Sequence, residues 1–224
     1  MYGDLQLEYS STVERAADEI RRALFAGRLE PGTPLREVAL SEAMGVGRST
    51  IREALAVLVA DGVAVRVPNK GVAVKELSAA DVGDLSRARV ALESAGVRRW
   101  TEATPEQRAA VHEAAEAYTR LAATTGDTAA LTEAHLRIHR ALVGLTGSRR
   151  LLAAADVYNA ELRLGLAHLD RVRGNIAEQV EDHRLLVGLL EAGRVEEAAV
   201  ELDRHLAAAE VSLRDAIGHG TIER

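Results

Sequence analysis

The chain has 224 residues, of which 47% are hydrophobic but only 3% aromatic, and its formal net charge is −6 at pH 7. This length suits one large or two small domains, and the abundance of alanine and leucine favours helices packed through aliphatic side chains over sheets. The absence of cysteine excludes disulfide bonds and thiolate metal sites.

The N-terminal stretch MYGDLQLEYS lacks the basic start and the apolar run of a signal peptide, and apolar runs such as ALAVLVA are far too short to span a bilayer. We therefore expect a cytoplasmic protein with no membrane partner. Residues 1–75 hold ten basic and ten acidic side chains, whereas residues 76–224 hold eighteen basic and twenty-four acidic ones. Because screening restricts each charge to about 8–10 Å, a local basic surface in the first part could still bind phosphates.

Three helices and a hairpin are predicted for the first part of the chain. Ser11 followed by Glu14 is typical of a capping box, and Gly27 ends the helix that starts there. A short helix over residues 36–44 and a helix over 48–60 follow, separated by Gly-Val-Gly. Valines then alternate on both sides of Pro-Asn-Lys-Gly, which indicates a β-hairpin with a four-residue turn. This order is that of a winged helix-turn-helix domain, which we assign to residues 1–75.

The remainder, residues 76–224, has a helical pattern throughout. Ser78 with Asp81, and the sequence Thr-Pro-Glu-Gln from Thr104, are further N-terminal capping signals. Short connectors separate six expected helices: from Ser78 to about Trp100, from Thr104, from Ala129 to Leu145, from Ser148 to about Arg173, from Asn175 to about Gly193, and from Val195 to Ile217. We therefore predict a mainly α protein whose second domain is an antiparallel bundle of six or seven helices.

The stretch GVGRSTIREAL places polar and basic residues at the start of the third helix: Arg48, Ser49, Thr50 and Arg52. A recognition helix reads the major groove with its N-terminal end, where arginine can bond guanine in a bidentate way. The alternative is an ordinary solvated helix start. Asn69, Lys70 and Gly71 form the expected tip of the wing, which could meet a minor groove or phosphate, or be a plain turn.

The apolar residues on either side of the Gly-Val-Gly turn are expected to pack where the two helices cross: Leu40, Met44, Val46, Ile51 and Leu55. Gly45 is the position at which the chain must turn without a side chain in the way.

The stretch LEPGTPLREVALSEAMGVGRSTIREALAVLVADGVAVRVPNKGVAV resembles the DNA-binding domain of GntR-type bacterial transcription regulators, over about residues 11–75. The helical remainder resembles the FCD ligand-binding domain of the FadR subgroup, through DLSRARVALESAG, IHRALVGLTGS and EDHRLLVGLLEAGRVEEAAVELDRHL. The helix-turn-helix departs from the family pattern at Gly47, Ser49-Thr50 and Val38. The operator sequence is therefore not transferable in detail.

Four of the seven histidines fall where a helical bundle could assemble a metal site: His135, His139, His183 and His205. His135 and His139 are four residues apart, so both rings lie on the same face of their helix. Neutral imidazoles suit zinc, nickel, copper or iron better than magnesium or calcium. A His-x-x-x-His pair alone is weak support, because most such pairs make ordinary hydrogen bonds.

The resemblance adds to this interpretation. Metal-binding members of the family use an aspartate four residues before a histidine, and then two further histidines, and here His135 stands in the aspartate position. We therefore predict an all-nitrogen site for a divalent transition metal, with zinc favoured and nickel as the alternative. Two other interpretations stay open: a metal-free pocket in which the histidines bond the effector directly, and a purely structural cluster. We interpret the remaining histidines as solvated or packing residues: His112, His168 and His219.

Arg89 and Glu93 are four residues apart on one predicted helix. In the family, an arginine at this position often faces the cavity and binds an effector carboxylate, for which a bidentate guanidinium is suited. The alternative is a surface ion pair of little energetic value. Arg163 is a second, weaker candidate for the effector.

We thus expect a DNA-binding homodimer that represses transcription from an inverted-repeat operator and is released by a small carboxylate bound near a metal. Two linked DNA-binding domains bind DNA with much higher affinity than one domain alone. The two-fold axis of a homodimer also matches the two-fold axis of an inverted repeat in the DNA. The rivals are an activator, a DNA-binding protein without a specific site, and a helical-bundle metalloenzyme with an accessory winged-helix domain. Against an enzyme, the chain has no His-Glu-x-x-His, Glu-x-x-His or Gly-x-Ser-x-Gly motif.

Overall fold

The computed structural model describes residues 11–169 and 176–220, and for residues 167–169 and 218–220 it describes the backbone only. The chain divides into two compact units, the first ending at Glu76 and the second beginning at Leu77. Four sequence predictions lie outside the described residues: the helix end near Arg173, the helix start at Asn175, and the side chains of His168 and His219. None of the described helices is long and apolar enough to cross a membrane.

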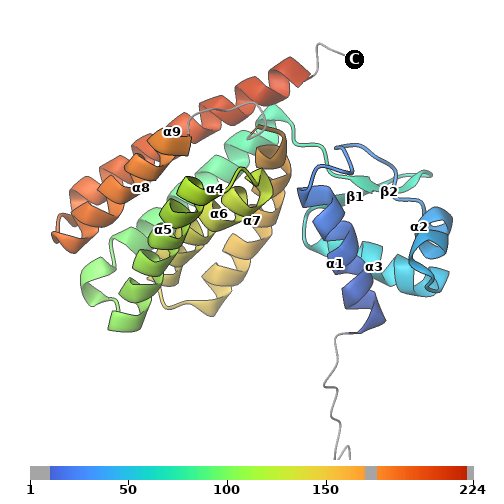
Figure 1. Cartoon of the computed structure of the whole chain (residues 1–224), viewed down its shortest axis with the longest axis horizontal. Helices are drawn as coiled ribbons and strands as arrows, with labels where there is room; N and C mark the ends of the chain where they lie inside the picture. The colour runs from blue at the N-terminus through green and yellow to red at the C-terminus, as the bar shows by residue number, and fades with distance from the viewer. Residues whose placement is uncertain (1–10, 170–175, 221–224) are drawn as a thin grey trace, which may run out of the picture. The chain divides into compact units, whose positions relative to one another are not determined.

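The first unit contains three helices and a two-stranded antiparallel sheet (Figure 1): α1 (Thr12–Phe25), α2 (Glu37–Met44), α3 (Arg48–Ala60), β1 (Ala64–Val67) and β2 (Gly71–Val74). The predicted capping box is present, because Ser11 accepts from the Glu14 backbone and the Glu14 carboxylate accepts from the Ser11 backbone. Helices α1 and α3 pack against each other and bury an aliphatic core: Ala17, Ile20, Leu24, Ile51, Leu55 and Leu58. The predicted winged helix-turn-helix order is confirmed.

The turn between α2 and α3 depends on Gly45, which ends α2 in the left-handed region with φ +64°. Only glycine adopts this conformation without steric cost. The Ser41 hydroxyl donates to the Val46 carbonyl at 2.6 Å and closes the turn. Of the apolar residues predicted to pack where the helices cross, only Ile51 and Leu55 are buried, whereas the others stay partly exposed.

The hairpin differs from its prediction in the length of its turn. Val67 pairs with Gly71, so the turn has the three residues 68–70 and not the four of Pro-Asn-Lys-Gly. The Lys70 backbone N–H donates to the Val67 carbonyl at 3.0 Å. Asn69 has φ +61°, a left-handed conformation that asparagine tolerates better than most residues. The physical reason for the difference is that cross-strand pairing extends one residue further than the turn signal suggests.

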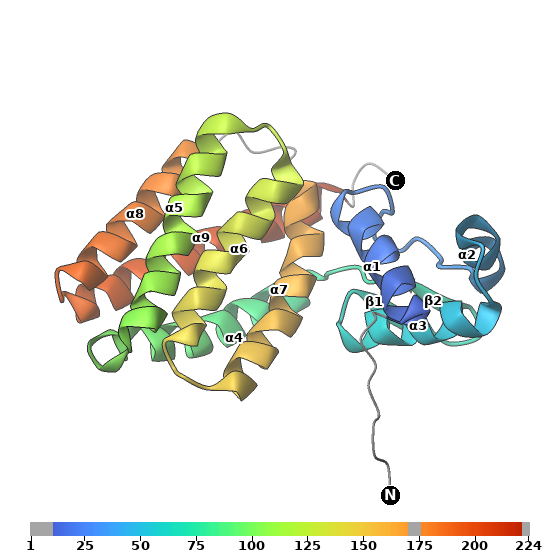
Figure 2. The same cartoon turned by 60° about the horizontal axis from the view of Figure 1, so that its bottom comes forward.

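The second unit contains six described α-helices, as predicted, and a short 3₁₀ turn (Figure 2): α4 (Ala79–Val97), 3₁₀ (Trp100–Glu102), α5 (Pro105–Thr124), α6 (Thr128–Gly144), α7 (Arg149–Leu169), α8 (Ile176–Glu191) and α9 (Val195–Gly220). The capping boxes at Ser78 and Thr104 are both formed. The helix expected to reach Trp100 ends at Val97, and the chain tightens there into the 3₁₀ turn. Helix α6 packs against α4, α5 and α7, and α9 packs against α4, α7 and α8.

Helices α4 and α6 approach each other closely at Gly96. A Cβ atom there would lie 1.9 Å from the Leu142 carbonyl oxygen, so a side chain has no room without moving the backbone. One turn before these positions, Glu93 on α4 and His139 on α6 are both buried. The tight contact between the two helices therefore brings this carboxyl group and this imidazole together in the interior.

The capping box at Thr104 provides a test of the helical unit. Replacing Thr104 with alanine removes the hydroxyl that accepts from the Gln107 backbone, which should cost about 1 kcal/mol of stability. The measurement is the free energy of unfolding in urea. Thr101→Ala is the control, because Thr101 is exposed three residues earlier. Equal stabilities of the two variants would contradict the role of the cap.

Candidate functional site

The start of α3 presents the residues predicted to read DNA. Arg48, Ser49 and Arg52 are exposed and Thr50 is partly exposed. Gly47 precedes the helix and provides no side-chain cap. The first backbone N–H groups of α3 therefore have no capping side chain, and together with the arginines they favour an anionic partner.

Arg52 has a partner that sequence reasoning missed. Its Nε and Nη2 atoms donate to the two carboxylate oxygens of Glu37, at 3.1 Å and 2.8 Å. The hydrogen bond from Arg52 lowers the pKa of Glu37, so the carboxyl group stays ionised at neutral pH. The pair joins the first turn of α2 to the first turns of α3, and it holds the guanidinium of Arg52 in one orientation.

The wing residues Asn69, Lys70 and Gly71 are exposed at the tip of the hairpin. They belong to the same compact unit as α3. The structure therefore leaves all of the predicted DNA-contacting residues accessible, at least in part, and buries none of them.

In the second unit the structure brings together the four histidines that the sequence singled out. His135 and His139 lie on α6, His183 on α8 and His205 on α9, and all four side chains are buried. One ring nitrogen from each lies within 4.8 Å of the others. The helical spacing of His135 and His139 was visible in the sequence, but the meeting of three helices was not.

Hydrogen-bond acceptors face the Nδ1 atoms of three of the rings. Nδ1 of His139 lies 2.7 Å from a Glu93 carboxylate oxygen, and Nδ1 of His183 lies 2.6 Å from the Gln179 carbonyl oxygen. Nδ1 of His205 is 3.5 Å from a carboxylate oxygen of Asp182. Because a carbonyl or carboxylate oxygen accepts, the short contacts of His139 and His183 favour the tautomer with the proton on Nδ1 and a lone pair on Nε2, and the longer contact of His205 is compatible with the same tautomer.

The Nε2 atoms of three of the rings lie close together. Nε2 of His139 lies 3.0 Å from Nε2 of His135 and 3.2 Å from Nε2 of His183. A tetrahedral zinc ion with bonds of about 2.0–2.1 Å would hold its nitrogens roughly 3.3–3.4 Å apart, close to these two separations, whereas the separations among all four ligand atoms extend up to 4.8 Å. Facing lone pairs repel each other, and either a metal ion between them or an Nε2–H on neutral His135, whose tautomer the contacts described above do not fix, would relieve this repulsion. The donor set therefore fits a transition-metal ion.

Protonation is a poor alternative for balancing these lone pairs. Burial lowers the pKa of His135, His139 and His205 well below the ordinary histidine value, and the neighbouring imidazoles and Arg89 lower it further. The pKa of His183 is lowered by burial as well. The rings are thus neutral at physiological pH, which is the form that binds metals.

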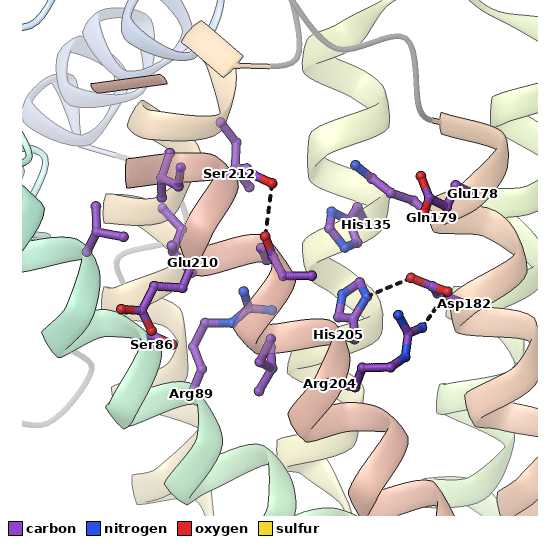
Figure 3. Close-up of a pocket in the computed structure, with 17 residues that line it drawn as sticks. Ser86, Arg89, His135, Glu178, Gln179, Asp182, Arg204, His205, Glu210 and Ser212 are labelled. Carbon is purple, nitrogen blue, oxygen red and sulfur yellow. Dashed lines mark hydrogen bonds and ion pairs between the residues drawn. The ribbon is translucent and has the colours of Figure 1, made fainter. Parts of the chain in front are cut away.

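Arg89 and Glu93 are not a surface pair. Their side chains are only 6% and 0% exposed, and Nε of Arg89 donates to Glu93 at 2.9 Å. Nη2 of Arg89 is buried without a hydrogen-bond partner among the described residues. Arg89 and His205 come from different helices and extend into the same space (Figure 3). The guanidinium therefore has a free donor beside the histidine cluster.

This space is a cavity of about 260 Å³, lined by α4, α6, α7, α8 and α9. Its apolar wall includes Leu162 and Leu213, and its polar wall holds residues of both charges as well as two of the histidines: Arg89, Arg204, Glu178, Asp182, Glu210, His135 and His205. The second predicted effector residue is placed differently: Arg163 donates to Glu133 at 2.9 Å and is not among the described residues that line the cavity.

Several residues of the site had no signal that sequence reasoning used. Gln179 contributes a backbone carbonyl, which no side-chain motif reveals. Asp182 directly precedes His183 and accepts from Arg204 at 2.7 Å. It faces His205 on the next helix, a contact that depends on how α8 and α9 pack.

Comparisons with known proteins assign both units of the chain to known domain families. Residues 12–74 match the family described as bacterial regulatory proteins, gntR family, and residues 84–208 match the FCD domain. The second match covers more than half of the chain.

Individual relatives match along most of their length. The chain is 28% identical over 205 residues to the probable D-xylose utilization operon transcriptional repressor of Paenarthrobacter nicotinovorans, covering 91% of this chain and 89% of that protein. It is 26% identical to the HTH-type transcriptional regulator YdhC of Bacillus subtilis strain 168, over 85% of this chain and 81% of that protein. A crystal structure from Rhodococcus sp. RHA1, assigned as a GntR transcriptional regulator, superposes with a TM-score of 0.79 at 28% identity, covering 91% of this chain and 98% of that one.

Proposed function

The chain belongs to the gntR family of bacterial transcriptional regulators and carries an FCD domain, and from this premise we propose that it is a homodimeric repressor controlled by a carboxylate. The matched proteins are regulators, so the chain is not an enzyme. In this proposal the first unit binds an inverted-repeat operator, and the second unit releases it when a small carboxylate binds beside a metal ion. The observation that carries the proposal is the buried histidine cluster beside the free guanidinium donor of Arg89.

The proposed DNA contacts are those of α3 and the wing. Arg48 and Arg52 would reach base edges or phosphates, Ser49 and Thr50 would bond phosphates, and Asn69, Lys70 and Gly71 would meet the neighbouring groove. One winged helix-turn-helix domain makes few contacts, so its DNA binding would be weak and sensitive to salt. Two such domains related by a two-fold axis would bind DNA far more tightly, and they require an inverted repeat in the DNA.

The proposed metal ligands are His135, His139, His183 and His205, with zinc favoured and nickel as the alternative. When bound, the ion would supply a positive charge next to the cavity. Four neutral ligands leave this charge uncompensated, in contrast to a site that contains an aspartate. The residues that orient the rings are Glu93, the Gln179 carbonyl and Asp182.

The proposed effector is an anion, and its carboxylate would accept from Nη2 of Arg89. A buried guanidinium donor without a partner is costly, and a carboxylate provides both the acceptor and the opposite charge. A neutral sugar would provide only the acceptor. The name of the Paenarthrobacter relative refers to D-xylose utilization. Glu178, Asp182 and Glu210 also line the cavity, so the preference for a sugar acid or another small carboxylate over the sugar itself rests on the free donor of Arg89 and on the proposed metal ion.

Two measurements on the full chain test the proposal. Fluorescence anisotropy should show tighter binding to the DNA upstream of its own gene than to random duplex of the same length at equal salt. Elemental analysis of protein purified without chelator should find a transition metal. Equal affinity for both DNAs would contradict the regulator with a specific operator, and a metal-free protein that takes up none on titration would contradict the metal site.

The ion pair of Glu37 with Arg52 gives a further prediction. Glu37→Gln removes a negative charge close to the phosphates and frees the guanidinium, so affinity for random duplex DNA should rise by at most about fivefold. Discrimination between operator and random DNA should fall, because Arg52 is no longer held in one orientation. Glu42→Gln, an exposed change on the same helix, is the control. Unchanged discrimination in Glu37→Gln would show that the pair plays no part in DNA reading.

A further inference from the structure

Glu93 connects the two halves of the site. Its side chain is fully buried on α4, and both of its oxygens are engaged: Oε1 accepts from Nε of Arg89 at 2.9 Å, and Oε2 accepts from Nδ1 of His139 at 2.7 Å. A continuous path therefore runs from the cavity through Arg89 and Glu93 to His139.

We propose that Glu93 is a positioning residue that couples the two ligands of this domain, so that a metal at the histidines strengthens anion binding at Arg89 and an anion strengthens metal binding. This inference rests on the proposed metal and effector sites and adds the residue that links them. Coupling of this kind is reciprocal, because the order in which two ligands bind cannot change the total free energy.

The metal side of the coupling follows from the hydrogen bond to His139. A metal ion on Nε2 withdraws electron density from the ring, which makes Nδ1–H a stronger donor to the carboxylate. In return, the carboxylate makes the ring a better ligand and fixes the tautomer that leaves Nε2 free. Loss of such an outer partner typically weakens metal binding about 10- to 100-fold.

The anion side follows from the charge of Arg89. In the absence of a metal, the carboxylate of Glu93 is the nearest compensation for the buried guanidinium. A stronger bond from His139 draws the carboxylate's charge toward the metal, so Arg89 is less well neutralised. Its buried Nη2, which has no partner among the described residues, then attracts an anion in the cavity more strongly.

A simpler role for Glu93 is possible in physical terms, in which it only neutralises Arg89 in the interior. In that case its removal would destabilise the protein but leave the metal affinity of the folded protein unchanged. A third case is that the anion binds the metal directly, so that coupling exists but does not pass through Glu93. The two ligands must therefore be titrated separately and together.

The test uses the full chain with Co²⁺ as the metal probe, followed by its visible absorption, and acetate as the anion probe. In the wild type we expect Co²⁺ to raise acetate affinity by a factor of about 5 or more. Glu93→Gln should weaken Co²⁺ binding about 10- to 100-fold and bring the coupling factor close to one. Glu116→Gln, an exposed carboxyl-to-amide change on α5, should change neither quantity.

A second variant guards against misfolding of Glu93→Gln, which leaves Arg89 buried without a counter-charge. The double variant Arg89→Met/Glu93→Gln removes both charges, and such a replacement of a buried pair is often tolerated. It should fold, lose acetate binding and show the same weakening for Co²⁺. Co²⁺ affinity equal to that of the wild type in either folded variant would overturn the inference.

The remaining outcomes separate this inference from the proposed function. Coupling that persists at full strength in Glu93→Gln would mean that acetate binds the metal directly. It would refute the coupling role of Glu93 but not the proposed metal and anion sites. If the wild type takes up no Co²⁺, both the proposed metal site and the coupling through Glu93 are refuted. A wild type that binds Co²⁺ but shows a coupling factor of one would leave the metal site standing and refute the coupling.

Discussion

Removing the metal should lower the stability of the protein by about 3–4 kcal/mol, if the metal is present at 100 to 1,000 times its dissociation constant. The reason is that one ring nitrogen from each of four buried imidazoles lies within 4.8 Å of the others, with two Nε2–Nε2 separations of 3.0 Å and 3.2 Å, so that a bound ion would satisfy lone pairs that otherwise face each other. The measurement is the thermal unfolding midpoint with added zinc and with excess chelator. An unchanged midpoint would mean that the cluster holds no ion under these conditions.

The same unfolding measurement should also show a dependence on pH. In the chelated protein, burial lowers the pKa of the four histidines below the ordinary value of 6.5. The unfolded chain therefore binds more protons than the folded one as the pH falls below 6.5, and stability is lost on acidification. Each such proton contributes about 1.4 kcal/mol per pH unit. Bound metal competes with these protons and should shift the loss to lower pH.

His112→Ala is the matched control for both the chelator effect and the pH dependence of stability. His112 is exposed and faces Glu116 and Glu191 at the surface, away from the cluster. Its replacement should leave the response to chelator unchanged, whereas His139→Ala should abolish it. A chelator effect that survives in His139→Ala would place the metal elsewhere in the chain.

Replacing Arg52 with alanine should lower operator affinity about 10- to 100-fold and relax the preference at one base pair. The guanidinium is exposed at the start of α3, where a recognition helix meets base edges. Affinity for random duplex should fall much less, because a lost base contact affects only the specific complex. The measurement is anisotropy on the operator and on single-base variants of it at fixed salt.

Arg22→Ala is the control for charge alone. Arg22 lies on α1, is exposed and pairs with Glu19, outside the recognition helix and the wing. The Arg22→Ala substitution removes one positive charge, as Arg52→Ala does, and should change operator affinity only slightly. Sequence-selective binding that is as strong in Arg52→Ala as in the wild type would refute the role given to α3.

The elements that were predicted well depend on local signals. The capping boxes at Ser11, Ser78 and Thr104 formed as expected, because a cap needs only residues three apart in the chain. Gly45 adopts the left-handed conformation that the tight turn between α2 and α3 requires. The hairpin turn was predicted one residue too long, because its length is set by cross-strand pairing between Val67 and Gly71, which is not a local property.

The sequence by itself determined the helices, the hairpin, the arginines at the start of α3 and the identity of the four histidines. Only the tertiary structure decided that Arg89 and Glu93 are buried, that Glu93 bonds His139, that Asp182 faces His205 and that Glu37 holds Arg52. The physical reason is that helical periodicity defines which residues share a face. Which residue meets that face from another helix depends on the packing register, and here that register is set by contacts such as the approach of Gly96 to Leu142.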